Sequence, residues 1–521
     1  MAISRKELLL GGLGASLLAF LAVLYVHKAP NPDQGIFDYI GWIGLTGGRY
    51  YVDVAEQNFP GEMLLHEWAF RLFGLKIWAY RALDFGILTL GAGALWRLFQ
   101  MAGVGHSALV GAAVYEAGYI SSNGWVSGQR DVIAANFLLF VGYAFVRRLK
   151  GGGRVWLLPL GLCLFFAILL RPTYLAFGLG LMVTDWLLLQ RYSRRLKSSL
   201  IDSALIGLII LFCVALFFAW GAKVGSLAAF REQGLLFNLQ AYSVGHSRLE
   251  TAAKLAAVLS RYLPIFPAVV AAIVWAERRM RWDAPFLVIL GIGVLAPVSA
   301  MLQNKGFGYH LGALLPPIWG LAGIGMSLSL QTLFLRHCSV LKRMLVGCIA
   351  ALALFGLLRQ ARSLGPQIRY VLGIQSFAAM MAREETGLDG FTWNDMVAAA
   401  SYAQRTTAPD ETILVWGRPV SIHLLAQRRS ATRFITFGML LLAREPFEFA
   451  GEWAREFSNA LVHAPPRLVF LPSIKDTPDY GASILGRAEN GSIVEPLRRA
   501  IDTRYEYVQS FGSLRAYRRR E

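Results

Sequence analysis

The chain has 521 residues, of which 55% are hydrophobic and only 16% are charged, and its formal net charge is +18. A soluble protein carries about 25% charged residues, so the composition argues against a soluble protein and indicates a polytopic membrane protein. The basic residues stand in short clusters between apolar runs, as in the cytoplasmic loops of membrane proteins, which argues against nucleic-acid binding. The four cysteines show no spacing typical of a metal site or a disulfide framework.

About eleven apolar runs can cross a membrane core of roughly 30 Å. We predict that the first is a retained helix rather than a signal peptide, because no cleavage site follows it. The run at 107–122 is short and contains Glu116. The runs cover residues 7–27, 77–99, 107–122, 132–147, 155–170, 173–190, 200–221, 261–276, 284–302, 310–334 and 343–360.

The Lys and Arg residues predict the orientation of these spans. Four loops on one side are rich in Lys and Arg, whereas the short loops on the other side hold three, Arg130, Arg171 and Lys305. The positive-inside rule therefore places the amino terminus in the cytoplasm and loops 28–75 and 222–260 outside. Segment 222–260 has the spacing of an interfacial amphipathic helix, with a substrate-gating lid as the alternative. We predict a multi-pass protein of a bacterial inner membrane.

The composition changes near residue 370, where polar residues return and no further span follows. We therefore predict two domains, a transmembrane catalytic domain over 1–370 and a soluble periplasmic α/β domain over 371–521. The second domain suits a cap or a scaffold for acceptor recognition. Its predicted strands cover 411–417, 433–437 and 467–471, with two more in 505–519, and its predicted helices lie near 389–404, 446–461 and 493–502.

The first outer loop is rich in carboxylates, and three of them are candidate catalytic groups. Asp33 precedes an apolar, helix-like run, so it is either a general base or only an N-cap. Asp38 lies five residues further on, which on a regular helix turns it about 140° away from Asp33. The two should therefore not act as a close pair, and Asp38 is the alternative base. Asp53 is either functional or a loop anchor.

Cationic and aromatic residues stand at the ends of spans on the same predicted face. Cations at headgroup depth can bind a phosphate and stabilise the charge that grows on it as it leaves. A carboxylate opposite them can accept the proton of an acceptor hydroxyl. The candidates for binding substrate and phosphate are Arg130, Arg171, Lys305, Tyr309 and His310.

Several cations also have purely structural interpretations. Arg130 can pair with its neighbour Asp131, and Arg171 can snorkel from a span end. Arg81 lies in the second span, three residues before Asp84 on one helix face. Because a charge inside the membrane is costly, we expect these two to pair, with contact of Arg81 to a lipid phosphate as the alternative.

Several motifs resemble those of the GT-C glycosyltransferases, in particular the protein O-mannosyltransferase-like and aminoarabinose transferase-like enzymes. In the first outer loop these are Asp33-Gln-Gly-Ile-Phe, Leu45-Thr-Gly-Gly-Arg-Tyr-Tyr-Val-Asp53 and Gln57-Asn-Phe-Pro-Gly61. The segment 303–310, followed by Leu-Gly-Ala-Leu-Leu-Pro-Pro317, is similar to a later outer loop of these enzymes. The resemblance extends over the membrane part and its helix order.

The resemblance implies a polyprenyl-phosphate-linked sugar donor and an inverting transfer to an outer-face acceptor, which is a glycan, a lipid or a protein. The family's catalytic aspartate falls on Asp33. Two departures stand out, since Gln34 replaces the usual glutamate, and Asn58 and Phe59 replace the usual lysine and proline. The cations at the span ends, or His310, would then have to supply the missing positive charge.

The resemblance leaves a divalent cation open, because some GT-C enzymes use one, but no ligand set in the sequence demands a metal. Two other classes of function remain as alternatives. One is a membrane transporter or a flippase for lipid-linked sugars, although such proteins often show inverted repeats and broken helices. The other is a non-catalytic partner in envelope assembly or polysaccharide export.

Overall fold

The computed structural model describes residues 5–242, 247–280, 283–334, 339–382, 391–443, 446–474, 477–478 and 491–521. Packing divides the chain into two compact units. Unit 1 comprises Met1–His27, Arg81–Phe217 and His246–Ile368, and unit 2 comprises Lys28–Tyr80, Phe218–Gly245 and Arg369–Glu521. Unit 2 therefore joins the first predicted outer loop to the C-terminal segment. The border near residue 370 that separates a catalytic from a soluble domain stays a prediction.

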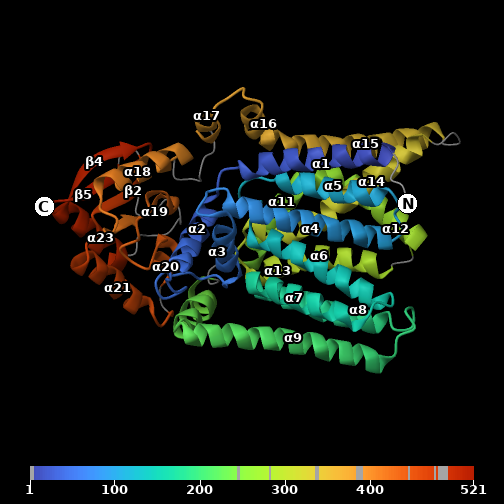
Figure 1. The fold of residues 1–521 in the computed structure, drawn as a ribbon, viewed down its shortest axis with the longest axis horizontal. Coiled ribbons are helices and arrows are strands. Elements are labelled where there is room, and N and C mark those ends of the chain that lie inside the picture. Colours follow the sequence, from blue (N-terminus) through green and yellow to red (C-terminus); the bar gives the residue numbers. More distant parts are fainter. Residues whose placement is uncertain are drawn as a thin grey trace. The chain divides into compact units, whose positions relative to one another are not determined.

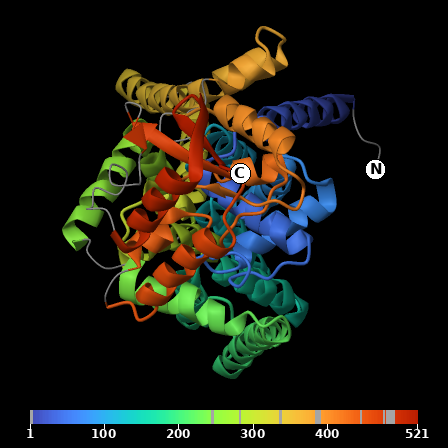
Figure 2. The ribbon, with the colours of Figure 1, turned by 90° about the vertical axis from the view of Figure 1, so that its left-hand side faces the viewer.

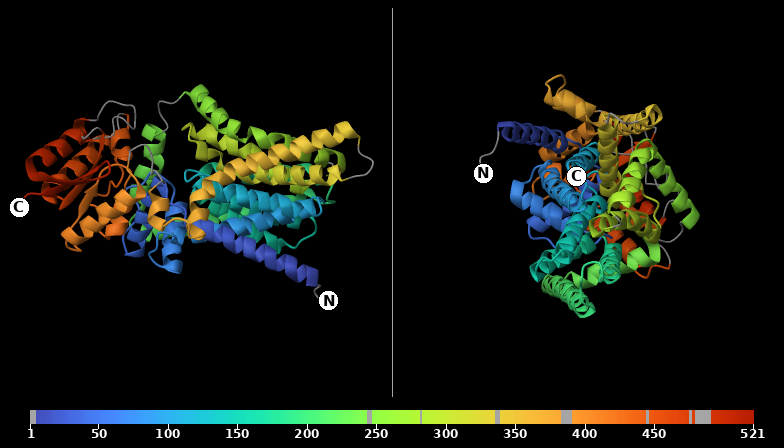
Figure 3. Two further views of the ribbon diagram at one scale, coloured as in Figure 1. Left: turned by 90° about the horizontal axis from the view of Figure 1, so that it is seen from above. Right: turned by 90° about the vertical axis from the view of Figure 1, so that its right-hand side faces the viewer.

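Unit 1 is a bundle of long apolar helices that run side by side (Figure 3). Each of the eleven predicted apolar runs falls on a helix, and one more helix, α11, completes the set (Figure 1). The helices are α1 (Arg5–Val26), α4 (Ala79–Met101), α5 (Ser107–Ile120), α6 (Arg130–Leu149), α7 (Leu157–Leu170), α8 (Leu175–Leu187), α9 (Leu196–Lys223), α11 (Arg248–Leu259), α12 (Phe266–Met280), α13 (Ala284–Gln303), α14 (Leu315–Leu333) and α15 (Val340–Ala361). The first two residues of α4 and the last six of α9 belong to unit 2.

Among the described residues, seven helical stretches are long and apolar enough to cross a membrane, and two apolar helices are shorter. The surface of α9 supports this assignment, because Leu211 and Phe212 are each 64% exposed. A continuous apolar surface of this kind is stable against lipid rather than water. The chain is therefore an integral membrane protein, as its composition predicts.

Helix α14 lies at the centre of the bundle and packs against α5, α12 and α15. Its contact with α5 depends on two glycines. A Cβ atom at Gly323 would lie 2.8 Å from the Cα of Gly111 and 2.9 Å from the backbone oxygen of Val110. Only glycine allows this approach, and small residues at crossing points are how membrane helices pack closely.

Unit 2 contains a small mixed sheet with helices on both faces (Figure 2). The strand order is β1-β2-β5-β4, with β1 parallel to β2, the other pairs antiparallel, and β3 paired to β2. The strands are β1 (Ile413–Val415), β2 (Leu468–Ile474), β3 (Thr477–Pro478), β4 (Tyr505–Phe511) and β5 (Leu514–Arg519). The helices are α2 (Pro32–Leu45), α3 (Gly61–Phe73), α10 (Leu227–Phe230), α17 (Phe377–Met381), α18 (Trp393–Thr406), α19 (Ser421–Ala426), α20 (Phe437–Leu442), α21 (Ala450–His463) and α23 (Gly491–Arg504), and α16 (Gly365–Val371) begins in unit 1 and ends in unit 2.

Alternate residues of the central strands enter two different cores, because successive side chains of a strand point to opposite faces. On β2, Val469 and Leu471 join α21 and α23, whereas Leu468 and Phe470 join α18 and α19. The parallel pairing of β1 with β2 requires a long crossover, which α19, α20 and α21 provide. The predicted α/β class of this part is confirmed.

The predicted strand at 433–437 is wrong. Phe434 and Phe437 are buried as the pattern indicates, but the segment has an irregular backbone that leads into α20. The carbonyl of Arg433 accepts a hydrogen bond from the amide of Ala55 at 2.7 Å, and the side chain of Thr432 accepts one from the amide of Phe434 at 3.1 Å. The first outer loop and a local side chain therefore take the hydrogen bonds that a strand would use.

The predicted amphipathic segment 222–260 is helical on both sides of residues 243–246, which lie outside the described residues. On one side, α10 continues into two π-helical turns, Arg231–Leu236 and Asn238–Tyr242. On the other side lies α11, which Ser247 caps. The first part belongs to unit 2 and the second to unit 1.

Candidate active site

Asp33 lies in the first turn of α2, and its neighbour Asn31 is the N-cap. The Asn31 side chain accepts a hydrogen bond from the amide of Gln34 at 2.7 Å, and Pro32 occupies the first helical position. The interpretation of Asp33 as the N-cap is therefore wrong, because Asn31 holds that position. Asp33 is half-buried at a helix N-terminus, where the helix dipole favours a negative charge.

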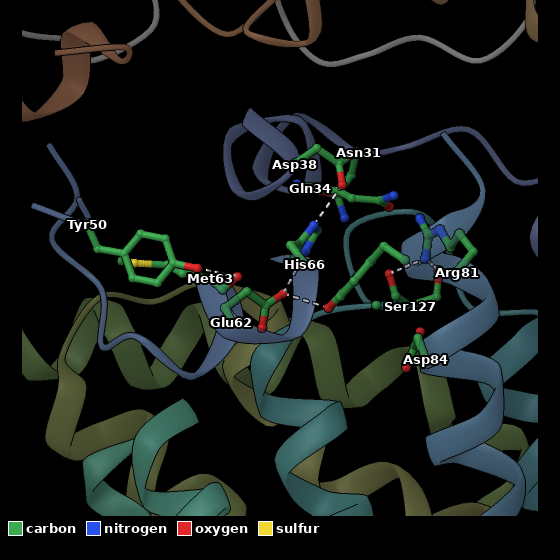
Figure 4. A network of polar contacts seen from close by, with 12 residues as sticks. Asn31, Gln34, Asp38, Tyr50, Glu62, Met63, His66, Arg81, Asp84 and Ser127 are labelled. Carbon is green, nitrogen blue, oxygen red and sulfur yellow. Dashed lines mark hydrogen bonds and ion pairs between the residues drawn. The ribbon is translucent and has the colours of Figure 1, made fainter. Parts of the chain in front are cut away.

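Asp38 faces a buried histidine that the sequence analysis did not single out (Figure 4). Asp38 Oδ1 lies 2.7 Å from His66 Nδ1, and Glu62 Oε1 lies 3.7 Å from His66 Nε2. The Tyr80 ring stacks on His66 with centroids 3.5 Å apart, and its hydroxyl donates to Glu62 at 2.7 Å. All four side chains are buried. Asp38 thus connects α2 to α3.

The electrostatics of this cluster favour a charged imidazole. Burial lowers the pKa of His66, but the charge and hydrogen bond of Asp38, with a smaller effect of Glu62, outweigh it and raise the pKa above 6.5. The signal in the sequence was the spacing of Glu62 and His66, four residues apart on one helix face. Nothing local indicated that Asp38 would meet that face.

Asp53 is bound to Arg49 in an exposed turn. Its carboxylate accepts from the Arg49 amide at 2.7 Å and from the guanidinium at 3.1 Å. The side-chain hydrogen bond from Arg49 lowers the pKa of Asp53. These contacts are those of a loop anchor, which was one of the two interpretations of this residue.

Asn58, which stands where the GT-C pattern has a lysine, also has partners inside the loop. Its backbone amide donates to Glu56 Oε1 at 3.0 Å, and its carbonyl accepts from the Tyr51 hydroxyl at 2.7 Å. The backbone amide of Glu56 in turn donates to Gln233 Oε1 at 3.0 Å. Hydrogen bonds inside the loop, together with one to Gln233, therefore hold the position where the GT-C pattern has a lysine.

The C-terminal part of unit 2 packs against the helix that carries Asp33. A Cβ atom at Gly35 would overlap the hydroxyl of Ser421 on α19. The Tyr39 ring lies 5.0 Å from the His423 ring, and the Tyr39 hydroxyl accepts a hydrogen bond from the Ser430 amide at 2.9 Å. These contacts fix α2 on α19, so the C-terminal segment helps to position Asp33.

In unit 1, Arg171 forms a buried bidentate pair with Asp131. Arg171 Nε and Nη2 lie 2.9 Å and 2.6 Å from the two carboxylate oxygens, and the Tyr174 hydroxyl donates to the same carboxylate at 3.2 Å. The snorkelling interpretation of Arg171 is therefore wrong. The carboxylate of Asp131 binds Arg171, forty residues away, whereas the sequence suggested the neighbour Arg130 as its partner.

The predicted phosphate set gathers in one region of unit 1. The turn Gly308–Leu314 packs against α6 and α13, which brings His310 close to the start of α6. Arg171, Lys305 and Arg130 all lie near the buried His310, so that their positive charges interact with its imidazole. The Tyr309 ring contacts the His310 ring edge-on, with centroids 4.7 Å apart. Tyr309 also interacts electrostatically with Arg171. Residues 130, 171, 305, 309 and 310 thus form one cationic and aromatic group.

Arg81 belongs to a buried polar cluster of unit 1 (Figure 4). Its guanidinium donates to the carbonyl of Ser127 at 2.8 Å and to the hydroxyl of Tyr25 at 3.1 Å. The Tyr25 hydroxyl donates to Asp84, and so does that of Tyr119, at 2.7 Å. Arg81 and Asp84 are therefore linked through Tyr25, which agrees with the expected structural role of the pair.

No group of three or more His, Cys, Asp and Glu side chains is arranged to hold a metal ion within the part of the chain that the structure describes.

Comparison with known proteins identifies the fold. No family model and no curated protein matches the chain. The crystal structure of ArnT from Cupriavidus metallidurans bound to undecaprenyl phosphate is similar, with a TM-score of 0.58 and 13% identity over 99% of this chain and 98% of that one. The chain has the GT-C fold. The apo form of the same protein matches with a TM-score of 0.56 and 14% identity, over 97% of each chain. The fold predicted from the outer-loop motifs is confirmed.

Proposed function

We propose that the chain is a membrane glycosyltransferase that moves a sugar from a polyprenyl-phosphate carrier to an outer-face acceptor, with inversion at the anomeric carbon. The GT-C fold supports this proposal over nearly the whole chain, since a similar structure was solved with undecaprenyl phosphate. The observation that carries it is the group of cations around His310, because burying several like charges close together is costly.

In the proposed reaction this group binds the phosphate of the donor. Lys305 and Arg130 supply positive charge, and Arg171, which Asp131 holds in place, adds a rigid guanidinium. As the bond between the anomeric carbon and the phosphate oxygen breaks, the electron pair stays on that oxygen. The cations then stabilise the negative charge that grows there. Tyr309 and His310 complete the walls of this phosphate site.

Asp33 is the proposed general base. It accepts the proton of the acceptor hydroxyl while the hydroxyl oxygen attacks the anomeric carbon from the side opposite the phosphate. The transition state resembles an oxocarbenium ion, so a nearby carboxylate stabilises it as well. Asp38 is less suited to the role, because His66 already holds its carboxylate.

The proposed topology places the amino terminus in the cytoplasm and the outer loops, with the C-terminal domain, in the periplasm of a bacterial inner membrane. The Lys and Arg distribution supports this orientation. The packing of α19 on α2 suits a scaffold that presents an acceptor, whether glycan, lipid or protein, to Asp33.

The decisive experiment is a transfer assay on the purified protein with a panel of undecaprenyl-phosphate-linked hexoses and pentoses. We expect release of free undecaprenyl phosphate that depends on an acceptor hydroxyl. Asp33→Asn should lower the rate by about 10²–10⁴-fold, the usual effect of losing a general base. Asp410→Asn, an exposed carboxylate of the same unit, is the control and should leave the rate unchanged.

Full activity of Asp33→Asn would show that the base lies elsewhere. Absence of turnover with every donor, together with movement of the lipid-linked sugar across vesicles, would favour the flippase alternative.

A further inference from the structure

A second candidate binding site lies at the other end of α6 from Arg130. It is a cavity of about 590 Å³ formed by the end of α6, the loop after it and the connection between α8 and α9. All of its lining residues belong to unit 1. Because α6 has 20 residues and rises about 1.5 Å per residue, the cavity lies roughly 28 Å from Arg130 along the helix. The two sites are thus separated by about the thickness of a membrane core.

The cavity is lined by cations whose positions are set by carboxylates. Its cationic lining consists of Arg148, Lys150, Arg191, Arg194 and Arg195. Asp202 binds Arg148 at 2.8 Å and Arg194 at 2.5 Å, and the neighbouring Arg154 at 3.0 Å. Asp283 binds Lys150 at 3.0 Å and Arg191 at 3.6 Å. Such pairing fixes long side chains in place before any ligand arrives.

The charges around the cavity do not balance. Only three carboxylates, Asp185, Asp202 and Asp283, take part in its ion pairs in the described part of the chain, against the five lining cations and Arg154. Arg195 is exposed and lines the cavity from the α8–α9 connection. The surplus positive charge in a preformed cavity suits an anion, and guanidinium groups match the geometry of a phosphate.

Exposed apolar side chains flank the same connection. Trp186 and Leu187, at the end of α8, are 57% and 79% exposed, and Leu196 and Leu200, at the start of α9, are each 50% exposed. Both helices belong to the apolar bundle, so these side chains meet lipid. A free phosphate would use the cations alone, whereas a phospholipid would use the cations and this apolar surface together.

We propose that the cavity binds the phosphate of an anionic phospholipid, with its acyl chains along Leu187, Leu196 and Leu200. By the predicted orientation this lipid belongs to the cytoplasmic leaflet, where basic segments bind anionic headgroups. The site is independent of the proposed transferase reaction and uses none of its residues. Binding there ties together the ends of α6, α8 and α9.

The test compares lipid binding to the full-length purified protein by native mass spectrometry. The double variant Arg191→Gln/Arg195→Gln removes two exposed cations and leaves the pairs of Asp185 and Asp202 intact. The control Lys197→Gln/Lys342→Gln removes two exposed charges from the same predicted face but outside the cavity lining. All proteins should elute and unfold alike without added lipid.

We expect phosphatidylglycerol to bind the wild type, and its affinity to fall by about tenfold or more in Arg191→Gln/Arg195→Gln. The control variant should bind phosphatidylglycerol like the wild type. Phosphatidylcholine should bind to neither the wild type nor the control variant. Equal loss in the control would overturn the proposal in favour of a diffuse positive surface. If phosphatidylcholine bound as tightly as phosphatidylglycerol, charge would play no role in binding and the proposal would fail. If equimolar inorganic phosphate fully displaced the lipid, the ligand of this cavity would be a soluble phosphate and not a phospholipid.

Discussion

Replacing Asp38 by asparagine should destabilise unit 2 most at low pH and least at high pH. His66 is buried between Asp38 and Glu62, and although burial lowers its pKa, the two carboxylates raise it above 6.5. A histidine with a raised folded pKa contributes stability that is fully present below about 6.5 and is lost as the pH rises through the folded value. Each pKa unit corresponds to about 1.4 kcal/mol.

The Asp38→Asn side chain keeps the shape of the carboxylate but not its charge. Removing one partner of a buried ion pair typically costs about 3–5 kcal/mol, and we expect the lower end because Glu62 remains near His66. The loss should therefore be about 3 kcal/mol near pH 6. It should shrink as the pH rises through the folded pKa of His66, because the imidazole is then neutral in both proteins and the ion pair no longer exists.

The assay is thermal unfolding of the purified protein in detergent, followed by tryptophan fluorescence from pH 6 to pH 9. Burial lowers the pKa of His423 to about 4, so its contribution to stability changes below about 6.5, but it changes equally in both proteins and cancels from their difference. Asp53→Asn, whose partner Arg49 is exposed, is the control and should follow the wild type. A constant difference between Asp38→Asn and wild type over this pH range would refute the assignment of a charged His66.

Three other changes test the remaining contacts. Arg171→Met should destabilise unit 1 by about 3–5 kcal/mol in a thermal unfolding assay, because it leaves the Asp131 carboxylate buried without its guanidinium. A further Asp131→Asn change should restore much of the lost stability. Gly41→Ala should lower the stability of the protein by about 1–3 kcal/mol in the same assay, since its Cβ would lie 2.9 Å from the backbone of α3. Gly438→Ala is the control and should not destabilise the protein, because a Cβ there would have no atom within 4 Å. Lys305→Gln should weaken binding of undecaprenyl phosphate by about tenfold or more, as expected for the loss of a charged hydrogen bond. Unchanged binding would remove Lys305 from the phosphate site.

The apolar runs and patterns predicted most of the fold because their signals are local. A membrane helix must satisfy its own backbone hydrogen bonds, so a long apolar run is helical whatever surrounds it, and all eleven runs fall on helices. The strands at β2, β4 and β5 were predicted by apolar patterning. The pattern failed at 433–437, where the hydrogen-bond partner is Ala55, far away in the sequence.

The sequence by itself also determined which residue types stand at the span ends, and so the cationic set around His310 could be named in advance. Only the tertiary structure decided their partners. Asp131 binds Arg171 rather than its neighbour Arg130, and Asp38 binds His66, because helix packing brings together groups that no local spacing relates. An ion pair forms where the helices place two charges, whereas the order of the chain specifies only which charges each helix carries.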